Sequence, residues 1–124
     1  MQTTLDIQQR KLVLPRTVGG FVRATFEDLC EQPLGAGDYL AIADRFHTVF
    51  LENVPRLGPE KRNAARRLVH LIDALYEASA KLVVLADAEP EALYPAGDGA
   101  FEFERTASRL HEMRSADYLA RIRD

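Results

Sequence analysis

Apolar and polar residues alternate in the first part of the chain with the period of a strand that has one buried face. The segment LDIQQRKLVLP, residues 5–15, ends at a proline, and a turn at Gly19 and Gly20 separates it from a second alternating segment, FVRATF, residues 21–26. We therefore expect an antiparallel pair or a meander over residues 5–26. The apolar positions of the first segment that could face a core are Leu5, Ile7, Leu12 and Leu14.

A helical period then replaces the alternation. Asp38 is predicted to cap a short helix, and the strand HTVFLENVP, residues 47–55, is predicted to follow that helix. Val49, Phe50 and Leu51 are consecutive apolar residues, which is typical of a strand covered on both faces in a parallel sheet. The apolar residues at helical spacing after the cap are Tyr39, Leu40, Ile42, Ala43 and Phe46.

The strongest helical pattern spans residues 59–79, where a single apolar stripe follows the helical period. KLVVLA, residues 81–86, predicts a second buried strand. A strand, a long helix and a strand form a βαβ unit over residues 47–86, whose two strands should be parallel and joined in a right-handed sense. The stripe of the helix consists of Ala65, Leu68, Val69, Ile72, Leu75 and Tyr76.

The C-terminal third carries shorter patterns. We expect one helical turn at residues 90–93 and a short edge strand at FEFE, residues 101–104. RTASRLHEM, residues 105–113, and SADYLARIRD, residues 115–124, predict two short helices, the second of them capped by Ser115. The fold class that follows is α/β, with a small, partly parallel sheet around the βαβ unit, β strands at the N-terminus and helices at the C-terminus.

Composition narrows the class of protein further. A chain of 124 residues predicts a single domain, residues 1–124, and a net charge of −3 argues against a nucleic-acid partner bound by bulk electrostatics. Cys30 is the only cysteine, which excludes an intrachain disulfide and a cysteine-cluster metal site. No apolar run approaches the roughly 20 residues of a membrane span, and MQTTLDIQQRK lacks the apolar centre of a signal peptide, so we expect a cytoplasmic protein.

Polar residues at the ends of the two predicted buried strands are the first candidates for chemistry. Glu52 and Asn53 end one strand, and Asp87 follows the other. Glu52 could hold a metal as nucleotide hydrolases do, and Asp87 could lie beside it if the strands are neighbours. Asn53 cannot act as a general base, because a neutral amide has no useful proton affinity near pH 7. The alternative, which we favour on residue chemistry, is a polar strand end and a solvated acidic loop.

Arg105 and Arg109 are four residues apart, so they share one face of a predicted helix. They could reach a phosphate on a neighbouring subunit, or they could pair with surface acids. The three histidines lack the spacing of a zinc helix, the serines sit in no G-x-S-x-G elbow, and the phosphate-binding pattern G-x-x-x-x-G-K-[ST] is absent. We therefore predict no metal site and no catalytic residue in this chain.

Four ordered segments together resemble a known family. FEDLC, DYLAIADRFHTVFLENVP, ARRLVHLIDALYEASAKLVVLADAEPEALY and FERTASRLHEMRSADYLA are similar to the C-terminal part of the ZapE-type ATPases, bacterial relatives of the mitochondrial ATPase-family-gene-one-like proteins. The similarity runs from about Leu5 to about Arg121. Members are AAA+-like P-loop ATPases that use ATP and Mg²⁺, and their Walker A and Walker B half precedes the part that this chain resembles. The resemblance implies that this chain alone has no cofactor and hydrolyses no ATP.

The resemblance also implies roles for the candidate residues. Glu52 and Asn53 stand where two Walker B acids would be, and Asp87 stands where a sensor asparagine would be, so the segment looks like a degenerate AAA+ core half. We interpret Glu52 and Asn53 as a relic without a catalytic role. Arg105 and Arg109 fall in the family's R-x-x-S-R-L segment and are the best candidates for contact with a nucleotide or a neighbouring subunit.

The function implied is that of a C-terminal module that assembles subunits or binds protein partners. Its expected partners are the N-terminal ATPase half of the family, a protein of the division or membrane-protein quality-control machinery, and further copies of itself. Peripheral contact with the inner membrane fits these roles. Two alternatives stay open: a free-standing adaptor derived from the family, and a weak nucleotide binder that uses Glu52, Asp87 and Arg109.

Overall fold

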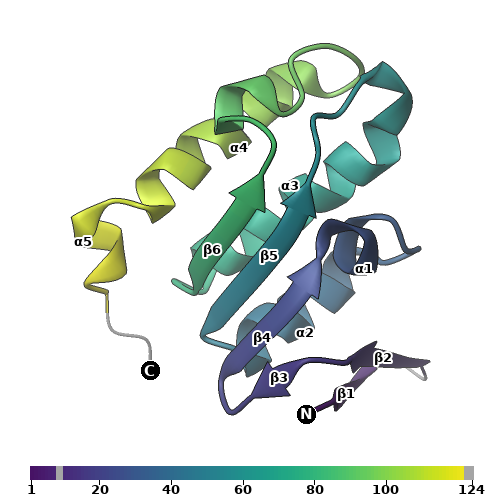
Figure 1. Cartoon of the computed structure of the whole chain (residues 1–124), viewed down its shortest axis with the longest axis vertical. Coiled ribbons are helices and arrows are strands. Elements are labelled where there is room, and N and C mark those ends of the chain that lie inside the picture. The colour runs from purple at the N-terminus through teal and green to yellow at the C-terminus, as the bar shows by residue number, and fades with distance from the viewer. Residues whose placement is uncertain (8–9, 122–124) are drawn as a thin grey trace.

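Three parallel strands form the centre of the molecule (Figure 1). The computed structural model describes residues 1–7 and 10–121. In this part of the chain, one sheet has the order β3-β4-β5-β6, in which β3 is antiparallel to β4 and the other neighbours are parallel. The strands are β3 (Thr17–Val18), β4 (Phe21–Thr25), β5 (Thr48–Val54) and β6 (Lys81–Ala86). The predicted α/β class with a partly parallel sheet is confirmed.

A hairpin of two further strands precedes this sheet. β1 (Thr3–Ile7) pairs antiparallel with β2 (Arg10–Leu14), as the alternation predicts. The hairpin is tied to β3 because the hydroxyl oxygens of Thr3 and Thr17 lie 2.6 Å apart and the Thr17 N–H donates to the Met1 carbonyl. The predicted core positions are confirmed: Leu12 and Leu14 are buried, and Leu5 and Ile7 pack against the core.

The predicted βαβ unit is present and its strands are parallel. η1 (Pro59–Lys61) and α3 (Arg62–Glu77) connect β5 to β6. A second crossover, which the sequence reading missed, runs from β4 through α1 (Phe26–Cys30) and α2 (Ala36–Arg45) to β5. Its signal was obscured because FVRATF fits both its antiparallel neighbour β3 and its parallel neighbour β5.

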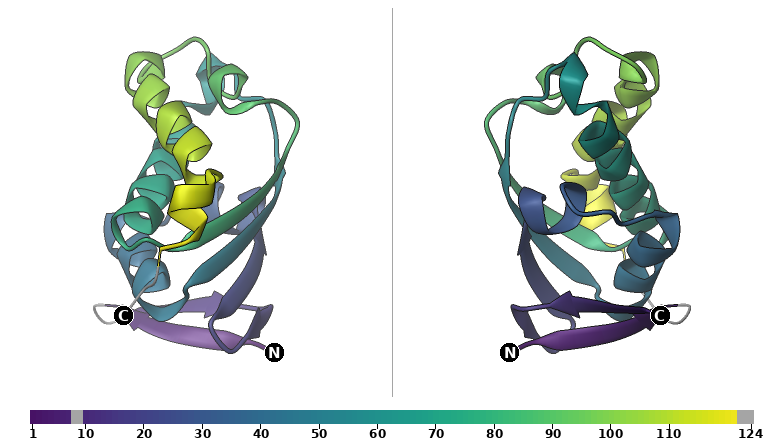
Figure 2. Two further views of the ribbon diagram at one scale, coloured as in Figure 1. Left: turned by 90° about the vertical axis from the view of Figure 1, so that its left-hand side faces the viewer. Right: turned by 90° about the vertical axis from the view of Figure 1, so that its right-hand side faces the viewer.

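The helices gather on one face of the sheet (Figure 2). β5 is therefore not covered on both faces, which corrects the interpretation of its apolar run. Val49 and Leu51 are buried toward the helices, whereas Phe50 on the opposite face is only half-buried. In the parallel register Phe50 lies opposite Val83 of β6, which is exposed on the same face.

The start of α2 differs from the prediction. Asp38 does not cap α2; Gly35 is the cap, and the Asp38 carboxylate, in the third helical position, accepts a bond of 2.7 Å from the Gly35 N–H. An acid at this position satisfies a free N–H of the first turn as a capping box does, so the helix begins earlier. Leu40 of the predicted apolar set is exposed. α1 has a full capping box, in which the side chain and N–H of Thr25 bond Asp28.

The predicted edge strand at 101–104 is wrong, because these residues begin α4 (Ala100–Met113). The alternation of FEFE covers too few residues to define a period, and only Phe103 of its two phenylalanines is buried. η2 (Pro90–Ala92) supplies the predicted turn, and Ser115 caps α5 (Ala116–Leu119) as predicted, accepting from the Tyr118 N–H. The second C-terminal helix thus ends at Leu119, and the prediction for residues 122–124 lies outside the described residues.

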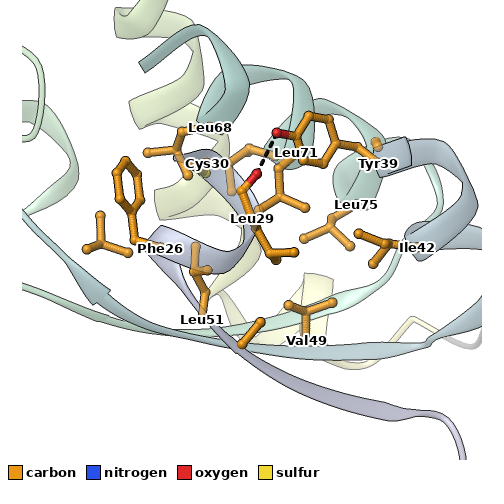
Figure 3. Packing of buried hydrophobic residues seen from close by; sticks show 14 of the residues in the cluster. Phe26, Leu29, Cys30, Tyr39, Ile42, Val49, Leu51, Leu68, Leu71 and Leu75 are labelled. Atoms are coloured by element: carbon orange, nitrogen blue, oxygen red, sulfur yellow. Dashed lines mark hydrogen bonds between the residues drawn. The ribbon is translucent and has the colours of Figure 1, made fainter. Parts of the chain in front are cut away.

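The core lies between the sheet and the helix layer (Figure 3). The Tyr39 hydroxyl donates to the Leu29 carbonyl at 2.6 Å, which joins α2 to α1 inside the apolar cluster. The predicted stripe of α3 is confirmed, since four of its residues are buried and Val69 and Tyr76 pack against the cluster. The side chains labelled in Figure 3 are Phe26, Leu29, Cys30, Tyr39, Ile42, Val49, Leu51, Leu68, Leu71 and Leu75.

Candidate functional site

Glu52 lies on the uncovered face of the sheet, near the carboxyl end of β5. Both of its carboxylate oxygens accept bonds of 2.7 Å from Arg23 of β4, and Arg16 adds a third contact at 3.3 Å. The hydrogen bond from the Arg23 side chain holds the pKa of the Glu52 carboxyl below its usual range, and the same bond raises the pKa of Arg23. The oxygens that a metal would need are thus occupied by two guanidinium groups.

Asn53 has a backbone role that the sequence did not suggest. Its φ is 60°, in the left-handed region, and the register between β5 and β6 is irregular between Leu51 and Val54. Asparagine tolerates this conformation better than most residues, because its short side chain can bond locally. The exposed amide therefore sits at the irregularity in the pairing of β5 with β6.

Asp87 follows β6 directly, and β5 and β6 are neighbours, as the pairing of Glu52 with Asp87 required. The two carboxylates nevertheless belong to different surroundings. Glu52 binds arginines on the β4 side, whereas Asp87 extends the pairing of β6, since its N–H donates to the Val54 carbonyl at 2.9 Å. Its carbonyl also faces Arg56 Nε at 3.5 Å, so Asp87 is tied to the strand end by its main chain.

Arg105 and Arg109 meet one carboxylate on the neighbouring helix. Arg109 Nη1 donates to Asp73 Oδ1 of α3, and its guanidinium carbon lies 4.6 Å from the centre of the Tyr76 ring. Arg105 approaches Asp73 more loosely, at 3.7 Å. The Arg109 side chain is 22% exposed and that of Arg105 is 63% exposed. Arg109 therefore connects α3 to α4, and Arg105 projects into solvent.

Sequence reasoning missed Asp73 as the partner of this pair. A signal was available, because Asp73 and Glu77 have the same four-residue spacing on α3 as Arg105 and Arg109 have on α4. Two helices with matched acidic and basic spacing can pair along their contact. The sequence did not show that α4 packs on α3, and without that contact the matched spacing does not predict an ion pair.

The open face of the sheet is the most distinctive surface of the molecule. We use this name for Val18, Phe21, Phe50, Val83 and Leu85. Four of these side chains are between 45% and 73% exposed, and Phe50 is half-buried between them. They line a hollow of about 440 Å³ together with Arg16, Arg23 and Glu52. The surface can therefore bind an apolar partner, with a charged cluster at one side.

Other chemistry has little support in the described part of the chain. No group of three or more His, Cys, Asp and Glu side chains there is placed to hold a metal ion. Cys30 is buried, and burial raises the pKa of its thiol well above the usual range, which makes it a poor nucleophile. No helix among these residues has the length and apolar character needed to cross a bilayer.

Comparison with known proteins gives one consistent result. A family model described as AFG1-like ATPase matches residues 1–122. Lactation elevated protein 1 homolog B of Danio rerio is 36% identical over an alignment 146 residues long, which covers 92% of this chain and 29% of the relative. Cell division protein ZapE of Escherichia coli (strain K12) is 37% identical over 118 residues, which cover 95% of this chain and 32% of the relative. The chain spans about a third or less of the length of these relatives. No solved structure matches it.

Proposed function

Because the chain belongs to the AFG1-like ATPase family, we propose that it is an assembly module of such an ATPase. In this proposal the open face docks on the part of the ATPase that carries the phosphate-binding loop. ATP and Mg²⁺ are bound by that other part, and this chain contributes a surface. The observation that carries the proposal is the open face itself.

Elementary packing supports this assignment. Parallel sheets occur almost only with both faces covered, because their crossovers and neighbours exclude water from both sides. Here the crossovers cover one face, and Phe21, Val83 and Leu85 remain exposed on the other. Water contact at these side chains costs about 25 cal/mol for each Å² of apolar surface, a cost that a partner would remove. A second layer of structure is therefore the expected occupant.

The charges beside the open face specify the partner further. Arg16 and Arg23 share the single carboxylate of Glu52, so the cluster keeps one excess positive charge. We infer that the docking surface of the ATPase part is apolar and carries an acidic side chain at its border. Such an acidic side chain would determine the orientation in which the two parts dock more than the affinity between them.

The nucleotide-binding alternative receives less support. It requires Glu52 and Arg109 to be available, and in the folded chain Glu52 binds two arginines while Arg109 binds Asp73. Calorimetric titration of the chain with Mg-ATP tests it: we expect no heat of binding at high micromolar protein. The free-standing adaptor would use the same open face, with a different protein on it.

The biological role that we propose follows the relatives. A cytoplasmic ATPase that contains this module would act on proteins, in support of cell division in bacteria or in the quality control of membrane proteins, with peripheral contact at the inner membrane. The protein partner in either process would meet the assembled enzyme. The name of the Escherichia coli relative gives the first of these roles its support.

A binding experiment tests the docking proposal. The part of the Escherichia coli relative that lies outside the segment similar to this chain is produced separately and titrated with this chain. We expect saturable binding, which Leu85→Asp on the open face weakens by about tenfold or more, as for a residue central to an interface. Leu40→Asp is the matched control, because Leu40 is similarly exposed on α2 in the helix layer. Equal binding by the two variants, or none by the parent chain, would refute the proposal.

A further inference from the structure

β6 is an edge strand with backbone groups that point away from the sheet. The Lys81 N–H donates to the His47 carbonyl and the Asp87 N–H donates to the Val54 carbonyl, so the odd-numbered residues of β6 face β5. In a parallel ladder the alternate residues point their N–H and C=O groups the other way. Leu82, Val84 and Ala86 therefore direct theirs outward, and no strand in the described part of the chain pairs with that side.

Hollows flank this edge on both faces of the sheet. The side chains of Leu82, Val84 and Ala86 line a hollow of about 280 Å³ against Leu110 and Met113 of α4. On the opposite side, Val83 and Leu85 belong to the open face. An added strand would place alternate side chains in the two hollows, which is how peptides recognise sheet edges.

The interior of β6 also lacks the usual protection of an edge strand. Natural proteins place a charge, a proline or a bulge in such a strand to prevent pairing with other chains. Residues 82–86 are Leu, Val, Val, Leu and Ala, and charges stand only at the two ends, at Lys81 and Asp87. The outer edge of β6 can therefore pair with another strand, and the charges of Lys81 and Asp87 determine which strand pairs best.

We propose that β6 pairs antiparallel with β6 of a second copy of this chain, about a two-fold axis at Val84. In this register the strand complements itself. Lys81 lies opposite Asp87 of the other copy at both ends, and Val83 lies opposite Leu85. The outward groups of residues 82, 84 and 86 form about six backbone hydrogen bonds, with Val84 opposite itself.

The charges discriminate against other arrangements of two copies. A parallel pair in register would place Lys81 beside Lys81 and Asp87 beside Asp87, and like charges directly opposite each other are destabilising. A slip by two residues in one direction places Lys81 opposite Leu85, and in the other direction opposite Glu89, which lies beyond the end of β6 and already contacts Arg114 at 3.3 Å. Lys81 Nζ now contacts the main-chain oxygen of Arg121 at 3.3 Å, an exposed contact that it can exchange for a carboxylate.

The dimer does not depend on the proposed function, but the two are compatible. A two-fold axis perpendicular to the sheet keeps both open faces on the same side, so the pair presents one continuous apolar surface. Glu52 of each copy lies on β5, and Arg16 and Arg23 lie on its far side, away from the new seam between the β6 strands. Docking of the ATPase part thus remains available to each copy.

Sedimentation equilibrium of the chain between about 1 and 200 μM tests the dimer, since pairing through one strand edge makes a small interface of the kind found in weak, reversible complexes. We expect a monomer–dimer equilibrium. Lys81→Glu should weaken it by about tenfold or more, and Asp87→Lys should do the same, because each creates two like-charge contacts. The double variant should recover most of the loss, since its exchanged charges again face each other. A parent chain that stays monomeric, or a double variant no better than the single ones, would overturn the proposal.

A backbone variant separates the edge from other surfaces. Val84→Pro removes an N–H that points outward, so it removes no bond to β5 and should abolish the dimer while the circular dichroism spectrum is kept. A dimer that persists in this variant would place the interface elsewhere and refute the proposal. If the parent chain is monomeric and Val84→Pro loses binding to the ATPase part, the dimer proposal is wrong and the edge of β6 binds the ATPase part instead. If the proline prevents folding, the exchange of charges still decides the question.

Discussion

Replacing Arg109 with alanine tests whether this side chain stabilises the contact between α3 and α4 or is available to bind a nucleotide. Arg109 donates to Asp73 on α3, stacks on Tyr76 at 4.6 Å, and is largely screened from water. A side chain reserved for a ligand would contribute little to the stability of the free chain. A clamp between α3 and α4 would contribute through both contacts.

The size of the loss can be worked from these contacts. A hydrogen bond between charged, partly buried groups contributes about 1.5 kcal/mol, at the low end for such bonds. The stacked guanidinium adds about 0.5 kcal/mol, as at exposed sites. We therefore expect Arg109→Ala to lower the free energy of unfolding by about 2 kcal/mol, which corresponds to a fall in Tm of about 8 °C for a domain of this size.

Urea titrations followed by circular dichroism measure this loss, and Arg105→Ala is the matched control. Arg105 is 63% exposed and approaches the same carboxylate at 3.7 Å, so its loss should cost less than about 0.5 kcal/mol. A double-mutant cycle with Asp73→Asn should give a coupling energy of about 1 kcal/mol for Arg109. Equal stabilities of the Arg105 and Arg109 variants, or no coupling to Asp73, would refute the clamp.

Three other predictions test single features. Ile72→Asp should unfold the chain, since it places a charge at a fully buried position of α3; a native circular dichroism spectrum would contradict this. Asn53→Ala should cost about 1 kcal/mol in urea unfolding and Asn53→Gly almost nothing, because φ is 60°; equal losses would argue against the left-handed backbone. Arg23 lowers the folded-state pKa of Glu52, so the stability that this ion pair contributes is complete above the unfolded pKa of about 4.3 and is lost as pH falls through the folded value. Glu52→Gln should therefore reduce the loss of stability at acid pH, and an unchanged plot of unfolding free energy against pH would show that the ion pair contributes nothing.

Local periodicity predicted the parts of the fold that depend on neighbouring residues. The βαβ unit over 47–86 followed from two apolar runs around an amphipathic helix, and the core positions of the first hairpin followed from alternation. The prediction of a strand at FEFE failed because four residues fit a strand and a helix equally well. Asp38 failed because a carboxylate can satisfy the first turn of a helix from inside it as well as from its cap.

The parts that failed most clearly depend on distant segments. The run Val49, Phe50, Leu51 is the same whether one or both faces of β5 are covered, so the open face could not be read from it. The assignment of Arg109 to Asp73 required the packing of α4 on α3. Strand ends and helical spacing located the candidate residues, but their partners emerged only when segments far apart in sequence were brought together.

The junction at Thr25 has a mechanical consequence. This residue is at once the last of β4 and the cap of α1, so no linker separates the strand from the helix. β4 carries Phe21 and Arg23 on the side where we place the ATPase, and α1 carries Phe26 and Leu29 in the core. A displacement of β4 by a bound partner is therefore passed directly to α1 and the core, because no flexible loop lies between the strand and the helix.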